Sequence, residues 1–122
     1  MDFALRSLRV TEVLHRTACG GVLATQLTRS ATSVAANYRA ALRGKSAADF
    51  INKVTIVLEE ADETEFWLEL AVRSGLVEAQ RVQGLRQEAL ELVRIFSATR
   101  RTALRRHRAR SQAKDVPPNH KS

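Results

Sequence analysis

The most informative part of the chain runs from Gln26 to Leu70, QLTRSATSVAANYRAALRGKSAADFINKVTIVLEEADETEFWLEL. It divides at Gly44-Lys45-Ser46, a short run of turn-forming residues between two long periodic segments. Before this turn, apolar residues recur on one helical face at Leu23, Leu27, Ala31, Val34, Tyr38 and Leu42. After it, a similar alternation of three and four continues at Phe50, Val54, Val57, Ala61, Thr64, Leu68 and Ala71. We therefore predict two long helices that pack along each other.

The same spacing, followed outward, predicts four helices: Asp2 to Thr17, Val22 to Arg43, Ser46 to Ser74 and Leu76 to about Arg110. Gly20-Gly21 and Gly75 separate the outer helices from the central pair. The predicted fold class is all-α, an antiparallel up-down four-helix bundle with long second, third and fourth helices and a basic C-terminal extension. Residues 1–110 are expected to form the bundle and residues 111–122 a disordered basic tail.

Polar side chains form rows on the second and third predicted helices. Small and polar residues at intervals of four, three and four share a face of the second helix, and acids crowd the third helix. Arg29, Arg39 and Arg43 are the expected cations for these acids, because like charges on one helix repel each other. We predict a structural inter-helix polar network of Gln26, Arg29, Ser30, Ser33, Asn37, Glu60 and Glu63.

The positive charge is concentrated at the C-terminal end. The chain has 122 residues and a net charge of +7. Residues 1–99 carry twelve Lys/Arg and twelve Asp/Glu, whereas residues 100–122 carry eight Lys/Arg and one acid, giving 8 − 1 = +7. Guanidinium groups suit bidentate contacts with phosphate. The candidate nucleic-acid-binding residues are Arg100, Arg101, Arg105, Arg106, Arg108 and Arg110.

Several function classes lack their usual signals. One cysteine, Cys19, excludes an internal disulfide framework, and we expect its thiol to be at least half-buried. No apolar run approaches the roughly 20 residues of a membrane span, and the N-terminus does not resemble a signal peptide, so we expect a cytoplasmic protein. The three histidines are not at metal-ligand spacing. We expect no metal, no cofactor, no catalytic residue and no enzymatic activity.

The Gln26–Leu70 segment resembles a bacterial four-helix-bundle family named for members encoded in 23S rRNA intervening sequences. The family pattern Q-x-x-R-S-x-x-S-x-x-x-N is met by Gln26, Arg29, Ser30, Ser33 and Asn37. The pattern S-x-x-[DE]-F is met by Ser46, Asp49 and Phe50, and E-x-x-E-x-x-x-W by Glu60, Glu63 and Trp67. The resemblance covers about residues 5–105. It implies a non-enzymatic homopentamer around a central channel.

The same family includes accessory proteins of diversity-generating retroelements, which are distant from this branch. That relation implies RNA or DNA and a reverse transcriptase as partners. Our first hypothesis is an accessory factor that binds the phosphate backbone through its arginine-rich end. The alternative is a protein-interaction or assembly scaffold that binds no nucleic acid. A third interpretation is that the basic helix end only complements the helix dipole and keeps the protein soluble.

Overall fold

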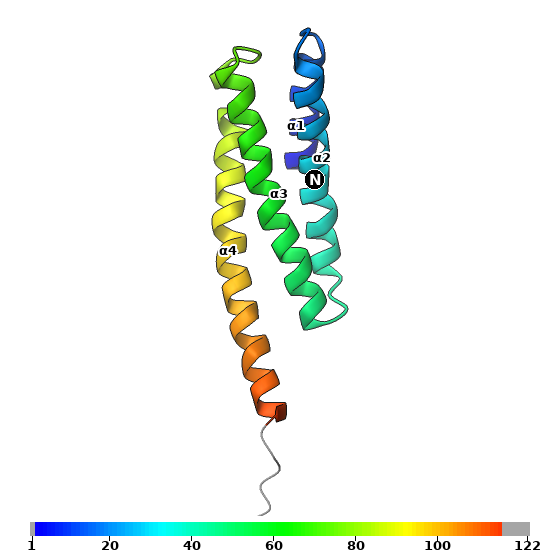
Figure 1. Ribbon diagram of the computed structural model, residues 1–122, viewed down its shortest axis with the longest axis vertical. Coiled ribbons are helices and arrows are strands. Elements are labelled where there is room, and N and C mark those ends of the chain that lie inside the picture. Colours follow the sequence, from blue (N-terminus) through cyan, green and yellow to red (C-terminus); the bar gives the residue numbers. More distant parts are fainter. Residues whose placement is uncertain (1, 116–122) are drawn as a thin grey trace, which may run out of the picture.

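The computed structural model describes residues 2–115 as four α-helices, with no strand in that range. They are α1 (Asp2–His15), α2 (Gly20–Leu42), α3 (Ala47–Arg73) and α4 (Ala79–Asp115). Consecutive helices run in opposite directions, as the ribbon in Figure 1 shows. The predicted all-α, up-down four-helix bundle is confirmed, including the greater length of the last three helices.

The turns explain where the predicted helix bounds shift. At the start of α3 the Ser46 hydroxyl accepts a hydrogen bond from the Asp49 backbone N–H at 3.0 Å, which caps the helix. At its end, Gly75 has φ +75°, and the Leu76 N–H donates to the Ala71 carbonyl at 3.1 Å. This Schellman-type hydrogen bond makes Leu76 part of the C-terminal cap of α3. α4 therefore begins at Ala79 rather than at Leu76.

The far end of α4 also differs from the prediction. The helix continues to Asp115, so residues 111–115 are helical and do not belong to a disordered tail. The rest of the predicted tail, residues 116–122, lies outside the described residues. Gln112, Ala113 and Lys114 are good helix formers, which explains why the helix continues through residues 111–115.

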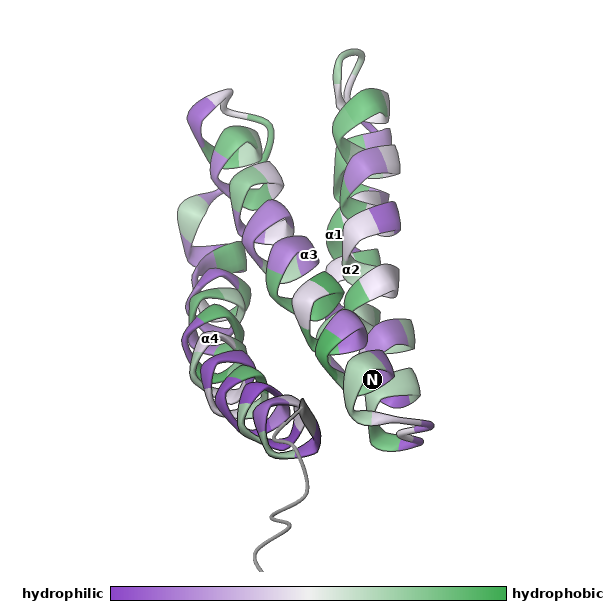
Figure 2. Ribbon diagram, turned by 60° about the horizontal axis from the view of Figure 1, so that its bottom comes forward, coloured by the Kyte–Doolittle hydropathy of each residue, from purple (hydrophilic) through white to green (hydrophobic). Residues whose placement is uncertain are grey.

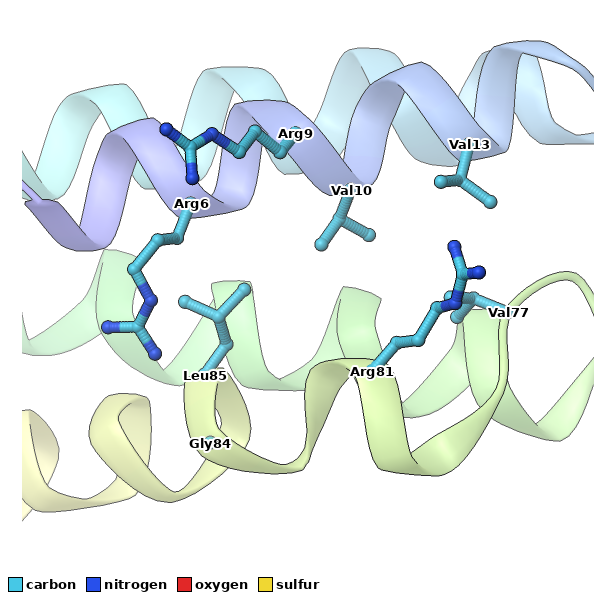
Figure 3. Close-up of a pocket in the computed structure, with 8 residues that line it drawn as sticks. All are labelled: Arg6, Arg9, Val10, Val13, Val77, Arg81, Gly84 and Leu85. Carbon is cyan, nitrogen blue, oxygen red and sulfur yellow. The ribbon is translucent and has the colours of Figure 1, made fainter.

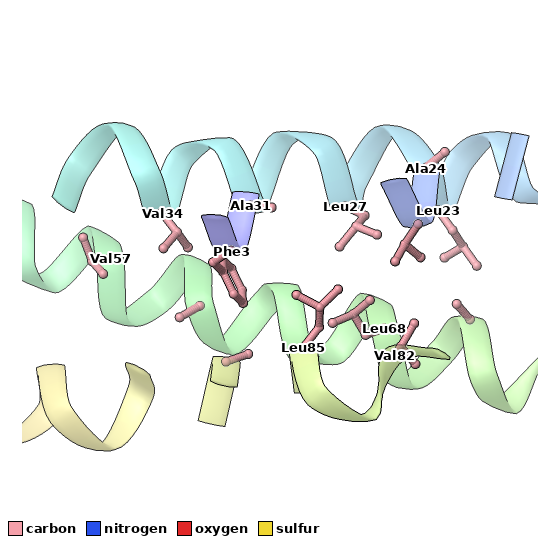
Figure 4. Close-up of a cluster of buried hydrophobic side chains, with 14 of the residues drawn as sticks. Phe3, Leu23, Ala24, Leu27, Ala31, Val34, Val57, Leu68, Val82 and Leu85 are labelled. Carbon is pink, nitrogen blue, oxygen red and sulfur yellow. The ribbon is translucent and has the colours of Figure 1, made fainter. Parts of the chain in front are cut away.

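The core follows the predicted seam of α3. Val54, Val57 and Leu68 are fully buried, and Leu27 of α2 and Leu14 of α1 also have no exposure. Figure 4 shows side chains from several helices meeting in this cluster. Truncating one of these leucines to alanine costs about 2–5 kcal/mol in comparable cores. The core therefore holds the helices in one register.

α1 is too short to cover the whole bundle. Its N-terminus lies beside Val34 of α2, and the α2–α4 seam continues past it without a fourth helix (Figure 1). The predicted apolar row on α2 is buried up to Val34, but Tyr38 and Leu42 are 45% and 71% exposed. Tyr38 packs edge-on against Phe96 at a ring-centroid distance of 5.8 Å. This half of the molecule is a three-helix structure.

Two further surface features bear on the predictions. Cys19 lies in the α1–α2 turn and is exposed, so the prediction of a half-buried thiol is wrong. The turn projects beyond the ends of both helices, which leaves no neighbour to cover the side chain. No helix within residues 2–115 is both long and apolar enough to cross a membrane.

Candidate nucleic-acid interface

The C-terminal part of α4 leaves the bundle and carries most of the excess positive charge. We call residues 101–115 the α4 extension. It is about 22 Å long at 1.5 Å per residue, and from Arg108 to Lys114 each of its residues is exposed. Figure 1 shows it running past the α2–α3 turn, and the ribbon colours of Figure 2 mark many of its residues as hydrophilic. The extension presents cations to solvent.

The arginines of the α4 extension form two stripes. At about 100° per residue, Arg101, Arg105 and Arg108 fall within roughly 60° of one another on the helix. Arg106 and Arg110 lie on nearly the opposite side. None of the five forms an ion pair with a carboxylate of residues 2–114. These guanidinium groups are therefore available to an external anion.

Arg100 differs from the other predicted phosphate-binding residues. It is partly buried, and its Nε donates a hydrogen bond to Thr55 Oγ1 of α3 at 2.9 Å. The side chain thus fixes α4 against α3 at the point where the extension begins. This contact separates Arg100 from the exposed stripes, although the sequence places it in the same basic run.

A second group of cations lies at the same end of the molecule, and sequence reasoning missed it. A cleft of about 400 Å³ at the α2–α3 turn is lined by Arg39, Arg43, Lys45 and Lys53, with Asp49 as its one acid. Lys53 and Asp49 are 3.6 Å apart. The other three cations form no ion pair with a described carboxylate. They come from two helices and the turn between them, so they do not form a continuous basic run that the sequence would reveal.

The predicted role of Arg39 and Arg43 therefore changes. The sequence predicts that both pair with the acids of α3, but within the described residues only Arg29 of the three α2 arginines does so. The reason is direction along the antiparallel pair. The acids lie toward the C-terminal half of α3, beside the first half of α2, whereas Arg39 and Arg43 lie beside the start of α3.

The polar row between α2 and α3 has Arg29 at its centre. The guanidinium contacts the carboxylates of both Glu60, at 2.8 Å, and Glu63. Gln26 accepts a hydrogen bond from Arg29 Nε at 3.1 Å, and Trp67 Nε1 donates to Glu63 at 3.2 Å. The structure thus brings together predicted residues from both helices and adds Trp67. Two carboxylates sharing one guanidinium form a structural clamp.

The smaller polar residues divide between two roles. The hydroxyls of Ser30 and Thr64, both fully buried, lie 2.9 Å apart across the α2–α3 contact. Asn37 instead bonds within its own helix, donating to the Ser33 carbonyl at 2.9 Å and to the Ser33 hydroxyl at 3.1 Å. Small hydroxyl side chains at the first contact let the two backbones approach closely, which favours this pairing of helices.

Glu60 is a carboxylate of this network with a shifted pKa. Burial raises its pKa above the ordinary value, and hydrogen bonding to and repulsion by Glu63 raise it further. Attraction to Arg29 and a hydrogen bond with Ser33 act in the opposite direction but do not outweigh burial. Arg29 is shared between two acids and is 46% exposed, which explains why its effect on Glu60 is limited.

Two further acids of α3, Glu65 and Glu69, form ion pairs with Arg86 of α4. Arg86 donates to Glu65 at 2.9 Å and lies 4.0 Å from Glu69. The sequence predicts these cations on the second helix alone, so the contribution of α4 is a correction. Within residues 2–115 no group of three or more His, Cys, Asp or Glu is placed to hold a metal ion. The acidic helix is therefore held by ion pairs from both of its neighbours.

Comparisons with known proteins agree with the motif resemblance. The family model described as 23S rRNA-intervening sequence protein matches residues 1–98. Among solved structures, the chain is similar to a protein of unknown function from the S23 ribosomal protein family of Bacteroides thetaiotaomicron VPI-5482. The two share 34% identity, covering 81% of this chain and 92% of the other, with a TM-score of 0.75. A search of curated proteins finds no match. The family match ends before the α4 extension, so the chemistry of the extension is inferred from the residues of the extension alone.

Proposed function

We propose that this chain, which belongs to the 23S rRNA-intervening sequence protein family, binds the phosphate backbone of double-stranded nucleic acid through the α4 extension. The observation that carries the proposal is the set of five exposed arginines without carboxylate partners among the described residues. A phosphate contact by each would release condensed counterions, the main source of sequence-independent affinity.

The two stripes favour a duplex over a single strand. An α-helix fits a DNA major groove about 12 Å wide. A helix lying in that groove needs cations on both of its sides to reach the two flanking backbones. Arg101, Arg105 and Arg108 would face one backbone, and Arg106 and Arg110 the other. The extension contains no Phe, Tyr or Trp on which unpaired bases could stack.

The cleft at the α2–α3 turn supports the same proposal. Arg39, Arg43 and Lys45 lie at the end of the bundle past which the extension runs (Figure 1). A duplex that lies along the extension would bring further phosphates toward this end. We therefore include the cleft in the interface, as a second set of phosphate contacts that does not depend on the extension.

The direct experiment compares full-length protein with a chain that ends after Arg100. Anisotropy with a labelled RNA duplex, a DNA duplex and a single strand of equal length, over a series of salt concentrations, measures affinity and its salt dependence. We expect the DNA duplex, whose major groove admits an α-helix, to bind more tightly than the single strand, and truncation to abolish most of that affinity. Equal binding by the two chains would refute the role of the extension.

A second candidate function is assembly without nucleic acid. It is favoured by the uncovered α2–α4 seam, where Tyr38 and Leu42 of α2 are exposed, as is Ile95 of α4 at 47%. A second copy could cover this seam and form the homo-oligomer that the family resemblance implies. Light scattering on the double variant Tyr38→Ser/Leu42→Ser tests this. A smaller particle with unchanged helicity would support assembly through the seam.

The two candidates are compatible with each other. An oligomer would bring several α4 extensions together and raise the effective concentration of arginine. Such a factor could also assist a reverse transcriptase, whose template is a nucleic acid; this partner stays a prediction from the resemblance. An oligomer that binds no duplex at low salt would favour the scaffold over the nucleic-acid-binding factor.

A further inference from the structure

A second open seam runs between α1 and α4. α1 packs mainly on α2 and α4 mainly on α3, so the first and last helices contact each other only sparsely. A groove of about 410 Å³ lies along this seam, near the turns at the end opposite the α4 extension. Its apolar lining comes from both helices and the connection before α4, namely Val10, Val13, Val77 and Leu85. Figure 3 shows Val10 and Leu85 pointing into the gap from opposite sides.

The charged side chains on the edges of this groove are all cations. They are Arg6 and Arg9 from α1 and Arg81 from α4. Arg6 is already engaged by Glu88 and by Asp2, the latter at 3.2 Å, and these acids raise its pKa. Arg9 and Arg81 form no ion pair with a carboxylate of residues 2–115. Two guanidinium groups therefore flank an apolar floor with no anion of the described chain to meet them.

The groove has the length of a short helical contact. The contact of Arg6 with Glu88 fixes the antiparallel register, which places Arg81 opposite Val13 and one helical turn from the level of Arg9. The span from Arg6 to Val13 is about 10.5 Å, or two helical turns. Gly84 lines the groove, and a Cβ there would meet only Arg6 Nη2, at 3.5 Å. The missing side chain leaves room for an incoming one.

We propose that this groove docks an acidic amphipathic helix of a partner protein. Apolar side chains at the i, i+3 or i+4, and i+7 positions of that helix would fill the floor, which is the usual arrangement of a helix bound in a groove. Two carboxylates on opposite flanks of that apolar face, about one turn apart along the helix axis, would meet Arg9 and Arg81. A nucleic-acid backbone fits this surface poorly, because it has no apolar groups to cover four aliphatic side chains. The proposal does not depend on nucleic-acid binding, which belongs to the opposite end.

The probe is a labelled synthetic helix with leucines on one face and one glutamate on each flank of that face, about one turn apart along the helix axis. Its anisotropy is measured with the full-length protein. We expect Arg9→Glu/Arg81→Glu to weaken binding by at least about tenfold, or 1.4 kcal/mol, without loss of helicity. Gly84→Leu should weaken it similarly by filling the groove, while leaving both charges in place. Arg94→Glu, also on α4 but outside the groove, should bind as the unaltered protein does.

Peptide controls separate the contributions. Replacing the glutamates with glutamines, or breaking the helix with a central proline, should each reduce binding. The proposal is overturned if the glutamine peptide binds equally, if neither groove variant affects binding, or if a short DNA duplex displaces the peptide. It is also overturned if the protein self-associates through this groove, so that Arg9→Glu/Arg81→Glu yields a smaller particle and the peptide cannot compete.

Discussion

Arginine occurs in two contrasting settings in this molecule, the α2–α3 contact and the α4 extension. Arg29 lies between Glu60 and Glu63, with Gln26 beside it. The arginines of the α4 extension are exposed and meet no carboxylate of residues 2–114. An arginine clamped by two acids has its charge satisfied within the fold. An unpaired one can bind an external anion without first breaking an ion pair.

The number of basic residues is therefore a poor guide to a binding surface. Residues 1–99 contain twelve cations, and half of them pair with a carboxylate, namely Arg6, Arg29, Lys53, Arg73, Arg86 and Arg94. What matters is which cations remain unpaired and whether they share an end of the molecule. The α4 extension meets both conditions, as do three cations of the α2–α3 cleft. Substitutions in each setting can test this contrast.

The strongest response is expected from neutralising the α4 extension. Changing Arg101, Arg105, Arg106, Arg108 and Arg110 to alanine should lower duplex affinity by at least about a hundredfold at low salt. Removal of each phosphate contact should also reduce the slope of log affinity against log salt by about 0.9. Alanine keeps the helix, so circular dichroism should be unchanged. Anisotropy over a salt series measures both quantities.

A matched control carries the same change in charge on the body of the molecule. Its substitutions to alanine are at Arg9, Arg16, Arg73, Arg81 and Arg94. We expect duplex affinity of this control to fall by less than about tenfold, with little change in the salt slope. If both sets weaken binding equally, net charge alone drives association, and the position of the arginines on the α4 extension has no bearing on it.

The next effect is on stability, at the clamp. Arg29→Ala leaves Glu60 and Glu63 side by side without their shared cation, and should lower the free energy of unfolding by about 1–2 kcal/mol. Thermal or urea unfolding measures it. Arg94→Ala is the control, because Arg94 and Glu91 form an exposed pair within one helix that is worth at most about 0.5 kcal/mol. Equal destabilisation at the two positions would show that the clamp is no more than a surface ion pair.

Much of this fold could be predicted because its information is local. The spacing of Val54, Val57 and Leu68 along α3 defines one buried face, and Ser46 and Gly75 mark the ends of that helix. The motif residues Arg29, Glu60 and Glu63 also meet in space. Spacing is sufficient for such features, since the helix itself converts sequence intervals into a common face.

The features that escaped prediction depend on how separate helices align. Periodicity contains no measure of how far α1 reaches, so it wrongly assigns Tyr38 and Leu42 to the covered face of α2. The α2–α3 cleft gathers Arg39 and Lys53 from different helices, and Arg86 reaches Glu65 across the α3–α4 contact. Neither arrangement leaves a signal in the linear spacing of charges.

A smaller effect is expected from the pH dependence of Glu60. Because its folded-state pKa is raised, the folded chain binds this proton more tightly than the unfolded chain does. The resulting stability is fully present below the unfolded pKa of about 4.3 and is lost as pH rises through the raised pKa. Glu60→Gln removes this loss, so the stability of the variant relative to the unaltered protein should increase as pH rises across that window.

Urea unfolding at a series of pH values measures the difference between the two proteins. Glu91→Gln, in an exposed pair on α4, serves as the control and should show no such trend. A difference for Glu60→Gln that stays constant with pH, or that favours the unaltered protein as pH rises, would mean that attraction to Arg29 outweighs the burial of Glu60.

The weakest response concerns Arg100, which lies where the two settings meet. Its hydrogen bond to Thr55 assigns it to the fold, although its neighbours in sequence belong to the α4 extension. Arg100→Ala should therefore lower the free energy of unfolding by about 0.5 kcal/mol and leave the salt slope of duplex binding unchanged. Arg101→Ala should do the reverse, because its side chain is exposed. If Arg100→Ala reduces the salt slope as Arg101→Ala does, the boundary between fold and interface lies one residue earlier, within the bundle.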